Sequence, residues 1–197
     1  MDRINMKTIA IVVFDKFTDI DIFLPWDLFN RIRFVRKDTV IKFVGTQAYH
    51  RSINGIDLKM HGMIEECKDA DIVFFGSGAG TRALYQDKEY LSRFQLDPER
   101  QIICSMCSGA LLLAGLGLLD QITATTYPSV KDLLKDMGVE VVDDQHLVTH
   151  GNIATAAGCL AAVDLLKWCI DKVFGQDVAD DVIKSVLPVG QGLECMY

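Results

Sequence analysis

The segment IICSMCSGALLLAGLGLLD, residues 102–120, constrains the fold of this chain more than any other stretch. Residues 102–104 form an apolar run that is typical of a buried strand, and residues 110–114 are all good helix formers. A tight turn has to join two such elements, and Cys107 lies where that turn falls. The segment therefore predicts a buried strand, a sharp turn at Cys107 and a helix.

Strand-like and helix-like segments alternate along the rest of the chain. A helical pattern covers residues 20–32, and the strand-like runs lie at residues 8–14, 40–45, 72–75 and 101–107. Such alternation is typical of βαβ units, which build a mostly parallel sheet covered on both faces. We therefore predict an α/β fold, a three-layer α/β/α sandwich with a mostly parallel central sheet.

Two hairpins and two further helices complete the predicted fold. Asn54-Gly55 and His150-Gly151 each lie between short alternating segments, which indicates a hairpin at both places. Helical patterns follow at about residues 161–173 and 178–186. Because we find no repeat and no linker, we expect residues 1–197 to form a single domain.

Composition limits the partners that we expect. Half of the residues are hydrophobic and the formal net charge is −7, which describes an acidic globule without the Lys/Arg clusters of nucleic-acid binders. No segment approaches the ~20 apolar residues of a membrane span. Asp15 ends the first apolar run too early for an export signal. We therefore expect a cytoplasmic protein that binds a small molecule, with no nucleic-acid or membrane partner.

The six cysteines are scattered, mostly within apolar segments, which favours reduced thiols. We expect Cys104, Cys159 and Cys169 to be buried packing residues. Cys107 differs because a turn between strand and helix presents its residue at the carboxyl edge of a sheet, where α/β folds bind ligands. A helix amino terminus also lowers a thiol pKa. We therefore predict that Cys107 is exposed and activated, with Gly109 leaving room in a crowded turn.

Two other interpretations of the cysteines are weaker. Cys104 and Cys107 form a C-x-x-C pair, but the redox version of this motif has both cysteines on the first turn of a helix, whereas Cys104 falls within a strand. A metal site would need a second such pair or suitably spaced histidines. The four histidines, at 50, 61, 146 and 150, have no ligand spacing. We therefore expect neither a metal nor a cofactor.

Several segments together resemble a known family. CSMCSGALLLAGLGLLDQITATTYPS is similar to the nucleophile-elbow segment of the ThiJ/PfpI superfamily, the class I glutamine amidotransferase-like proteins, and particularly of its isocyanide (isonitrile) hydratase-like branch. Three further segments resemble family elements in register: FDKFTDIDIFLPWDLF the opening turn and helix, DADIVFFGSGAG the strand that ends in the oxyanion glycine, and HGNIATAAGCLAAVDLLKW the hairpin and helix near the end. The resemblance covers nearly the whole chain and implies a flavodoxin-like sandwich and a homodimer.

The resemblance also implies roles for four residues. Cys107 is the implied nucleophile, and Asp21, four residues before Pro25, is the implied acid/base. Gly78 would donate its backbone N–H to the oxyanion pocket, with the Ser108 amide as second donor. Ser108 also supplies a hydroxyl where the hydratases commonly have Thr. Neighbouring Asp19 fits a solvated acid at the helix start better, since Thr18 and Asp19 are both plausible caps.

Two departures from the family pattern bear on function. Tyr127 follows the Thr-Thr pair where many members, including peptidase-like and deglycase-like ones, have His, and Gly76-Ser77-Gly78 replaces Pro-Gly-Gly. We expect His150 to be solvated in its hairpin turn, and His61 to lack an apolar frame that would fix it. A Cys-His dyad is therefore not expected.

Three functions remain open. The first is hydration of an isocyanide to an N-substituted formamide by Cys107 and Asp21, which requires no histidine. The second is another cysteine-dependent activity, of the deglycase, glyoxalase or amidase/peptidase type. The third is a non-enzymatic small-molecule or redox sensor, in which Cys107 oxidises to a sulfenic or sulfinic acid. The absence of histidine after the Thr-Thr pair favours the first.

Overall fold

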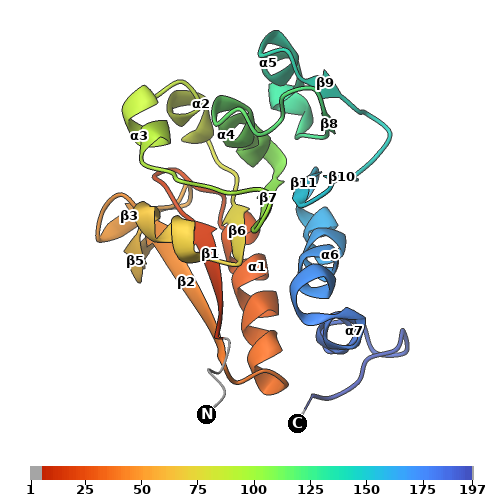
Figure 1. The fold of residues 1–197 in the computed structure, drawn as a ribbon. Helices are drawn as coiled ribbons and strands as arrows, with labels where there is room; N and C mark the ends of the chain where they lie inside the picture. The colour runs from red at the N-terminus through yellow and green to blue at the C-terminus, as the bar shows by residue number, and fades with distance from the viewer. Residues whose placement is uncertain (1–5, 197) are drawn as a thin grey trace.

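A seven-stranded sheet forms the centre of the computed structural model, which describes residues 6–196 (Figure 1). The strand order is β10-β11-β7-β6-β1-β2-β5, and every neighbouring pair is parallel except β10 with β11. The strands are β1 (Lys7–Val12), β2 (Thr39–Gly45), β5 (Gly62–Met63), β6 (Ile72–Phe75), β7 (Ile102–Met106), β10 (Leu147–His150) and β11 (Ile153–Ala156).

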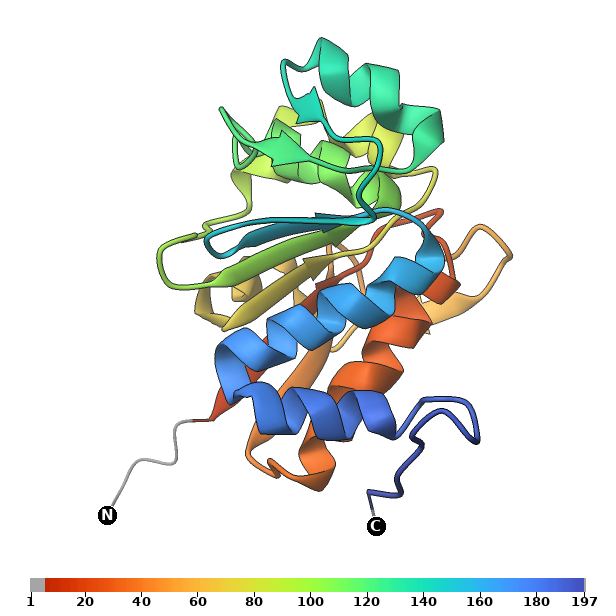
Figure 2. The same cartoon turned by 90° about the vertical axis from the view of Figure 1, so that its right-hand side faces the viewer.

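Helices cover both faces of this sheet, as Figure 2 shows most clearly. One face carries α1 (Ile20–Arg31), α6 (Ala162–Phe174) and α7 (Gln176–Lys184), and the other carries α2 (Thr81–Leu84), α3 (Lys88–Ser92), α4 (Ala110–Gly115) and α5 (Lys131–Asp136). Short 3₁₀ turns link them: η1 (Ile32–Phe34), η2 (Ile64–Asp69), η3 (Cys107–Gly109), η4 (Pro128–Val130) and η5 (Cys159–Ala161). The predicted three-layer α/β/α sandwich is confirmed. Within residues 6–196, no helix combines the length and the apolar character that crossing a bilayer requires.

Small strand pairs decorate the sandwich. Both predicted hairpins are present: β3 (Tyr49–Arg51) pairs with β4 (Asp57–Lys59) around Asn54-Gly55, and β10 pairs with β11. A parallel pair that the sequence did not indicate, β8 (Thr123–Ala124) with β9 (Glu140–Val141), lies next to α5. The last two helices were also predicted. The ends of α6 lie one residue from the predicted range, and those of α7 lie two residues from it.

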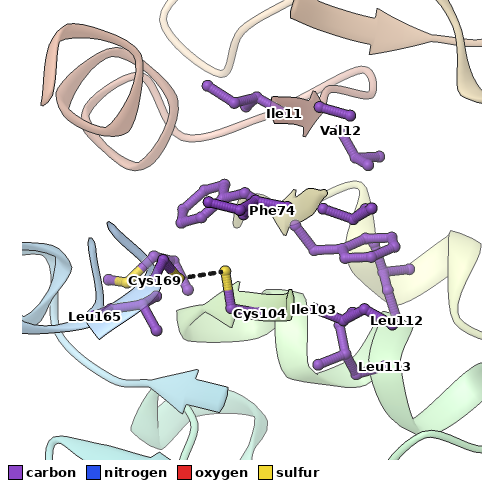
Figure 3. Close-up of a cluster of buried hydrophobic side chains, with 14 of the residues drawn as sticks. Ile11, Val12, Phe74, Ile103, Cys104, Leu112, Leu113, Leu165 and Cys169 are labelled. Atoms are coloured by element: carbon purple, nitrogen blue, oxygen red, sulfur yellow. Dashed lines mark hydrogen bonds between the residues drawn. The ribbon is translucent and has the colours of Figure 1, made fainter. Parts of the chain in front are cut away.

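The central strands are buried on both faces, as a sheet between two helical layers requires. Every residue of β6 and β7 is buried. Figure 3 shows Cys104 of β7 directed at Cys169 of α6, with their Sγ atoms 3.4 Å apart. Both side chains are fully buried, and burial raises the pKa of Cys169. These two cysteines are packing residues, as predicted, and all six cysteines are free thiols.

Because β1, β6, β7 and β11 run parallel, their carboxyl ends meet at one edge of the sheet. The segments that leave this edge begin at Val13, Gly76, Cys107 and Ala157. Four stretches far apart in the sequence are thereby brought together, and the candidate site lies among them.

Candidate active site

Cys107 occupies the sharp turn that the sequence predicted. β7 ends at Met106, and Cys107 has a φ of 48°, a backbone conformation that is unusual for a residue with a side chain. The Thr126 hydroxyl donates to the Cys107 carbonyl at 2.9 Å and helps to hold the turn. A Cβ on Gly109 would lie 2.7 Å from the carbonyl oxygens of Phe75 and Gly76, so the turn packs directly against the end of β6.

Asp21 lies beside Cys107 in space. It belongs to α1, which starts at Ile20, 87 residues before Cys107 in the sequence. An oxygen of Asp21 and the Sγ atoms of Cys107 and Cys159 all lie within 4.8 Å of one another. The carboxylate is only 1% exposed. Its Oδ2 accepts a 2.5 Å hydrogen bond from the Ser77 hydroxyl, while no described residue hydrogen-bonds to Oδ1. One carboxylate oxygen is thus left available near the two sulfurs.

These groups open into a cavity of about 300 Å³. Its lining combines polar groups from the loops after β1 and β6 with apolar surface from Ile53 and Tyr127. Arg82 contributes the lining's cation and donates from Nη2 to the Ser129 hydroxyl at 3.0 Å. The full lining is Thr18, Asp21, Ile53, Ser77, Gly78, Ala79, Arg82, Cys107, Ser108, Tyr127, Ser129 and Cys159. A cavity of this size and character suits a small molecule.

Gly78 and Ser108 contact each other in the wall of the cavity. The Gly78 N–H donates to the Ser108 Oγ at 3.2 Å, and the Ser108 hydroxyl in turn lies 3.3 Å from the Gly78 carbonyl, to which it donates. A Cβ on Gly78 would come within 2.3 Å of the Lys16 carbonyl oxygen, so the close approach of two loops demands glycine here. The N–H that the family resemblance assigns to an oxyanion therefore already has a partner, the Ser108 hydroxyl.

The acid–base state of Cys107 differs from the prediction. The residue is 3% exposed, so only its cavity-facing surface is accessible. Burial first, and then the Asp21 carboxylate, raise the pKa of the Cys107 thiol well above its ordinary value, and the Gly158 N–H opposes this only in part. The predictions of an exposed thiol and of a lowered pKa are therefore wrong. Removing the sulfur from water beside a negative charge outweighs the field of a short helix, so the resting thiol needs a neighbouring base.

Residues 7–172 match the sequence profile of the DJ-1/PfpI family. The chain belongs to this family. The matched residues include the turn at Cys107, the acid at Asp21 and the loop at Gly78, whereas α7 lies beyond them. The sequence resemblance to the ThiJ/PfpI superfamily is thereby confirmed.

Two curated relatives and two solved structures illustrate the range of the family. Isonitrile hydratase from Pseudomonas putida is 28% identical over 172 residues, which cover 87% of this chain and 74% of the relative. Protein DJ-1alpha from Drosophila melanogaster is 27% identical over 121 residues, 60% of this chain and 55% of the relative. A ThiJ/PfpI family protein from Pseudomonas syringae superposes with a TM-score of 0.80 at 26% identity, covering 92% of this chain and 76% of that one. Schizosaccharomyces pombe DJ-1 gives 0.76 at 22% identity, covering 92% and 100%, which shows the shared flavodoxin-like fold.

In this DJ-1/PfpI family member, Cys159 is the site residue that sequence reasoning missed. The prediction that it is a buried packing residue is wrong, because it opens η5, is partly exposed and lines the cavity. A usable signal existed, since Cys159 follows the strand β11, which runs parallel to β7 and ends at the same edge. A carboxylate and two thiols at this spacing could also ligate a thiophilic metal ion, although no fourth His, Cys, Asp or Glu among the described residues joins them.

The histidines lie away from the cavity. All four are within the described residues, and none lines it. His61 stacks on Trp26 and Phe43 with ring centroids 5.3 and 5.4 Å away, and its Nδ1 accepts the Phe43 N–H, so the expectation that it lacks an apolar frame is wrong. His150 ends β10, half-buried and 2.8 Å from the Thr123 hydroxyl, and does not lie in a solvated turn.

Tyr127 and Asp19 complete the comparison with the predicted site. Tyr127, which stands where many relatives have His, lines the cavity and is 47% exposed. Asp19 takes the cap position of α1, but its side chain makes no capping bond and accepts from the Asn54 amide at 2.7 Å. Asp21 is therefore the acid of this helix that faces the cavity.

Proposed function

We propose that this protein is an isocyanide hydratase-like enzyme, with Cys107 as nucleophile and Asp21 as acid/base. The observation that carries the proposal is the pairing of a buried thiol with a buried carboxylate at a cavity that no histidine lines. The similarity to isonitrile hydratase over 87% of the chain supports the same reaction. The coarser conclusion, a family that includes enzymes and a cysteine next to an aspartate, does not depend on it.

In the first half of the reaction, the Cys107 sulfur attacks the terminal carbon of R–N≡C. The thiol proton passes to the Asp21 carboxylate and from there to the same carbon, so that a thioimidate remains bonded to the sulfur. Because the thiol pKa is raised, this internal transfer replaces loss of the proton to solvent. The site carries one negative charge throughout, and no second charge has to be buried.

In the second half, water replaces the sulfur. Asp21 removes a proton from the water as its oxygen attacks the thioimidate carbon, and delivers that proton to the nitrogen. The carbon–sulfur bond then breaks, the departing sulfur takes the hydroxyl proton, and the N-substituted formamide leaves. Both Cys107 and Asp21 return to their starting states, and one water molecule is consumed.

Gly78 and Ser108 are suited to the oxygen that enters in this second half. In the free protein the Gly78 N–H is bound by the Ser108 hydroxyl at 3.2 Å, and a hydroxyl is a group that rotates easily. A substrate oxygen that takes its place would meet the Gly78 N–H and the Ser108 amide. The short bond from Ser77 holds the Asp21 carboxylate in position.

The missing histidine also separates this proposal from its alternatives. Deglycase-like and peptidase-like relatives often have His at the position of Tyr127, and a tyrosine that is 47% exposed offers no comparable base. The proposed hydration needs only the thiol and the carboxyl group. Action as a homodimer in the cytoplasm, as one domain over residues 1–197, remains a prediction.

The test is turnover of a simple alkyl isocyanide by the purified protein, followed as formamide production. Cys107→Ala should lower the rate by about a thousandfold or more, because the covalent path is lost. Asp21→Asn should lower it by about 10²–10⁴-fold, because the proton carrier is lost while the shape is kept.

Cys104→Ala is the matched control, since it removes a thiol from the strand that leads into the turn, outside the cavity. Its turnover should stay close to that of the wild type. Activity that survives the loss of Cys107 or Asp21 would reject the mechanism. Turnover of methylglyoxal, with none of the isocyanide, would reject the hydratase in favour of a deglycase or glyoxalase.

A further inference from the structure

Cys159 places a second thiol in the cavity, next to Cys107. It follows β11 after only Ala157 and Gly158, and β11 is the parallel neighbour of β7, which delivers Cys107. The two sulfurs lie within 4.8 Å of each other and both line the same cavity. The proposed hydration uses Cys107 and Asp21 only, so the chemistry leaves Cys159 without a role.

We propose that Cys159 is the resolving thiol of Cys107: a small hydroperoxide oxidises Cys107, and Cys159 then closes a disulfide between them. The inference shares the Cys107 sulfur with the proposed function, but it does not depend on which substrate that sulfur attacks.

The segment around Cys159 has the freedom that closing the bond requires. A disulfide needs a sulfur–sulfur distance of about 2.05 Å, so the sulfurs have to approach by up to about 3 Å. Gly158 has a φ of 90°, and no heavy atom lies within 4 Å of where its Cβ would be. The next residue after Cys159, Leu160, is 78% exposed. We therefore expect the segment around Cys159 to move towards Cys107, while the packed turn at Cys107 stays in place.

Access to the two thiols differs in a way that favours this order of events. Cys107 is buried except towards the cavity, which admits a small peroxide but excludes a large oxidant. Cys159 is partly exposed, so a small thiol can reach the disulfide from outside and reduce it. By contrast, Cys104 and Cys169 lie only 3.4 Å apart but are fully buried, with no opening to either reagent.

The chemistry balances with the residues present, one peroxide and an external thiol. Cys107 passes its proton to Asp21 and its sulfur attacks hydrogen peroxide; the oxygen–oxygen bond breaks, sulfenic acid forms, and the second oxygen leaves as water with that proton. The Cys159 sulfur then attacks the Cys107 sulfur, the sulfur–oxygen bond breaks, and the hydroxyl leaves as water with the Cys159 proton. Two thiols and one peroxide give one disulfide and two waters. Two small thiols later restore the dithiol and become a disulfide themselves.

The consequence is protection of the nucleophile. A sulfenic acid without a partner proceeds to the sulfinic acid, which most proteins cannot recover. A disulfide stops at the reversible stage. The sequence offers a direct way to detect it, because trypsin separates the partners: Cys107 falls in peptide 101–131, Cys159 in 136–167 and Cys169 in 168–172.

The experiment treats the full-length protein with a modest excess of hydrogen peroxide, blocks free thiols, and maps the tryptic peptides by mass spectrometry. We expect peptide 101–131 to be joined to 136–167 through Cys107, with Cys104 of the same peptide not in the link, and the two to separate after dithiothreitol. In Cys159→Ser, Cys107 should instead carry two added oxygens that dithiothreitol does not remove. Cys195→Ser, which removes an exposed cysteine far along the chain, should form the same link as the wild type.

Three outcomes would overturn the inference. The first is a wild-type Cys107 with two added oxygens beside a free Cys159. The second is a link from 101–131 to 168–172, which would involve the buried Cys169. The third is no change at Cys107. Isocyanide turnover is measured separately on the reduced protein. A protein that forms the link but hydrates no isocyanide would reject the proposed function alone.

Discussion

Cys104 and Cys107 lie three residues apart, and each has another cysteine as its neighbour, yet the two pairs have different surroundings. Cys104 meets Cys169 between β7 and α6, with the sulfurs 3.4 Å apart and both side chains fully buried among apolar residues (Figure 3). Cys107 meets Cys159 beyond the end of the strand, beside a carboxylate and a cavity.

The difference lies in what surrounds the sulfur, because the two pairs consist of the same side chain. Within a strand that is covered on both faces, a thiol is a small apolar group that fills space. Past the end of the strand, the backbone turns with a positive φ, and the start of α1 and loops from other strands bring polar groups to the sulfur beside a cavity. Position along a strand thus separates packing from chemistry in this fold.

The largest effect on stability is expected from adding a side-chain atom inside the turn that carries Cys107. Gly109→Ala would put a Cβ 2.7 Å from the carbonyl oxygens of Phe75 and Gly76, both part of the backbone. We expect the free energy of unfolding to fall by about 2–3 kcal/mol, since the end of β6 has to move. Urea unfolding measures it.

Gly138→Ala is the matched control for this turn. Gly138 has a φ of 88°, but no atom outside its chain neighbours lies within 4 Å of its added Cβ. Backbone strain alone should therefore lower the free energy of unfolding, by about 1–2 kcal/mol. If Gly109→Ala proves no more destabilising than Gly138→Ala, the tight packing of the turn at Cys107 against the end of β6 is refuted.

The second prediction concerns the charge of Asp21, which lies beside Cys107 and Cys159. The Asp21 carboxylate raises the pKa of Cys107, so Asp21→Asn should lower that pKa, although burial keeps it above the ordinary value. Below its pKa, the thiolate fraction rises about tenfold for each unit by which the pKa falls. We therefore expect the rate at which iodoacetamide modifies Cys107 to start rising at a pH about one unit lower in Asp21→Asn, the same variant in which turnover should fall.

The measurement uses a Cys159→Ser background, so that one cavity thiol is followed by peptide mapping. Cys104 falls in the same tryptic peptide and should stay unmodified in both proteins, because it is fully buried. A rise at the same or a higher pH in Asp21→Asn would contradict the role given to the Asp21 charge.

The smallest effect is expected at the core pair. Cys169→Ala removes one buried sulfur and its contact with Cys104, and should lower the free energy of unfolding by about 1 kcal/mol. Thermal unfolding would show the loss, and turnover and the peroxide-dependent link should both persist. Loss of either would mean that the two pairs are coupled, and the comparison drawn above would fail.

Particular elements show where sequence reasoning succeeded. The run at residues 72–75 coincides with β6, and the helix predicted at 20–32 ends one residue earlier, at Arg31. Both succeed because continuous apolar runs and helical periodicity report burial within one element. The parallel pair β8 with β9 escaped notice, since each strand has only two residues and no periodicity.

The site was predicted in part. The turn at Cys107 could be inferred because its strand, its turn and its helix are adjacent in sequence. The sequence alone did not reveal that His61 stacks against Trp26 and Phe43 from other elements, or that Asp21 of α1 contributes to the raised thiol pKa. Both depend on neighbours that are distant along the chain.

By itself, then, the amino-acid sequence determined the layered α/β architecture and the sharp turn at Cys107, because these follow from apolar patterns over a few consecutive residues. Only the tertiary structure decided that Cys159 joins the cavity, that Ser108 binds the Gly78 N–H and that the thiol is buried beside Asp21. The physical reason is that a parallel sheet brings the ends of its strands together at one edge. Which side chains meet there, and how far they are removed from water, cannot be read from the pattern of neighbouring residues in the sequence.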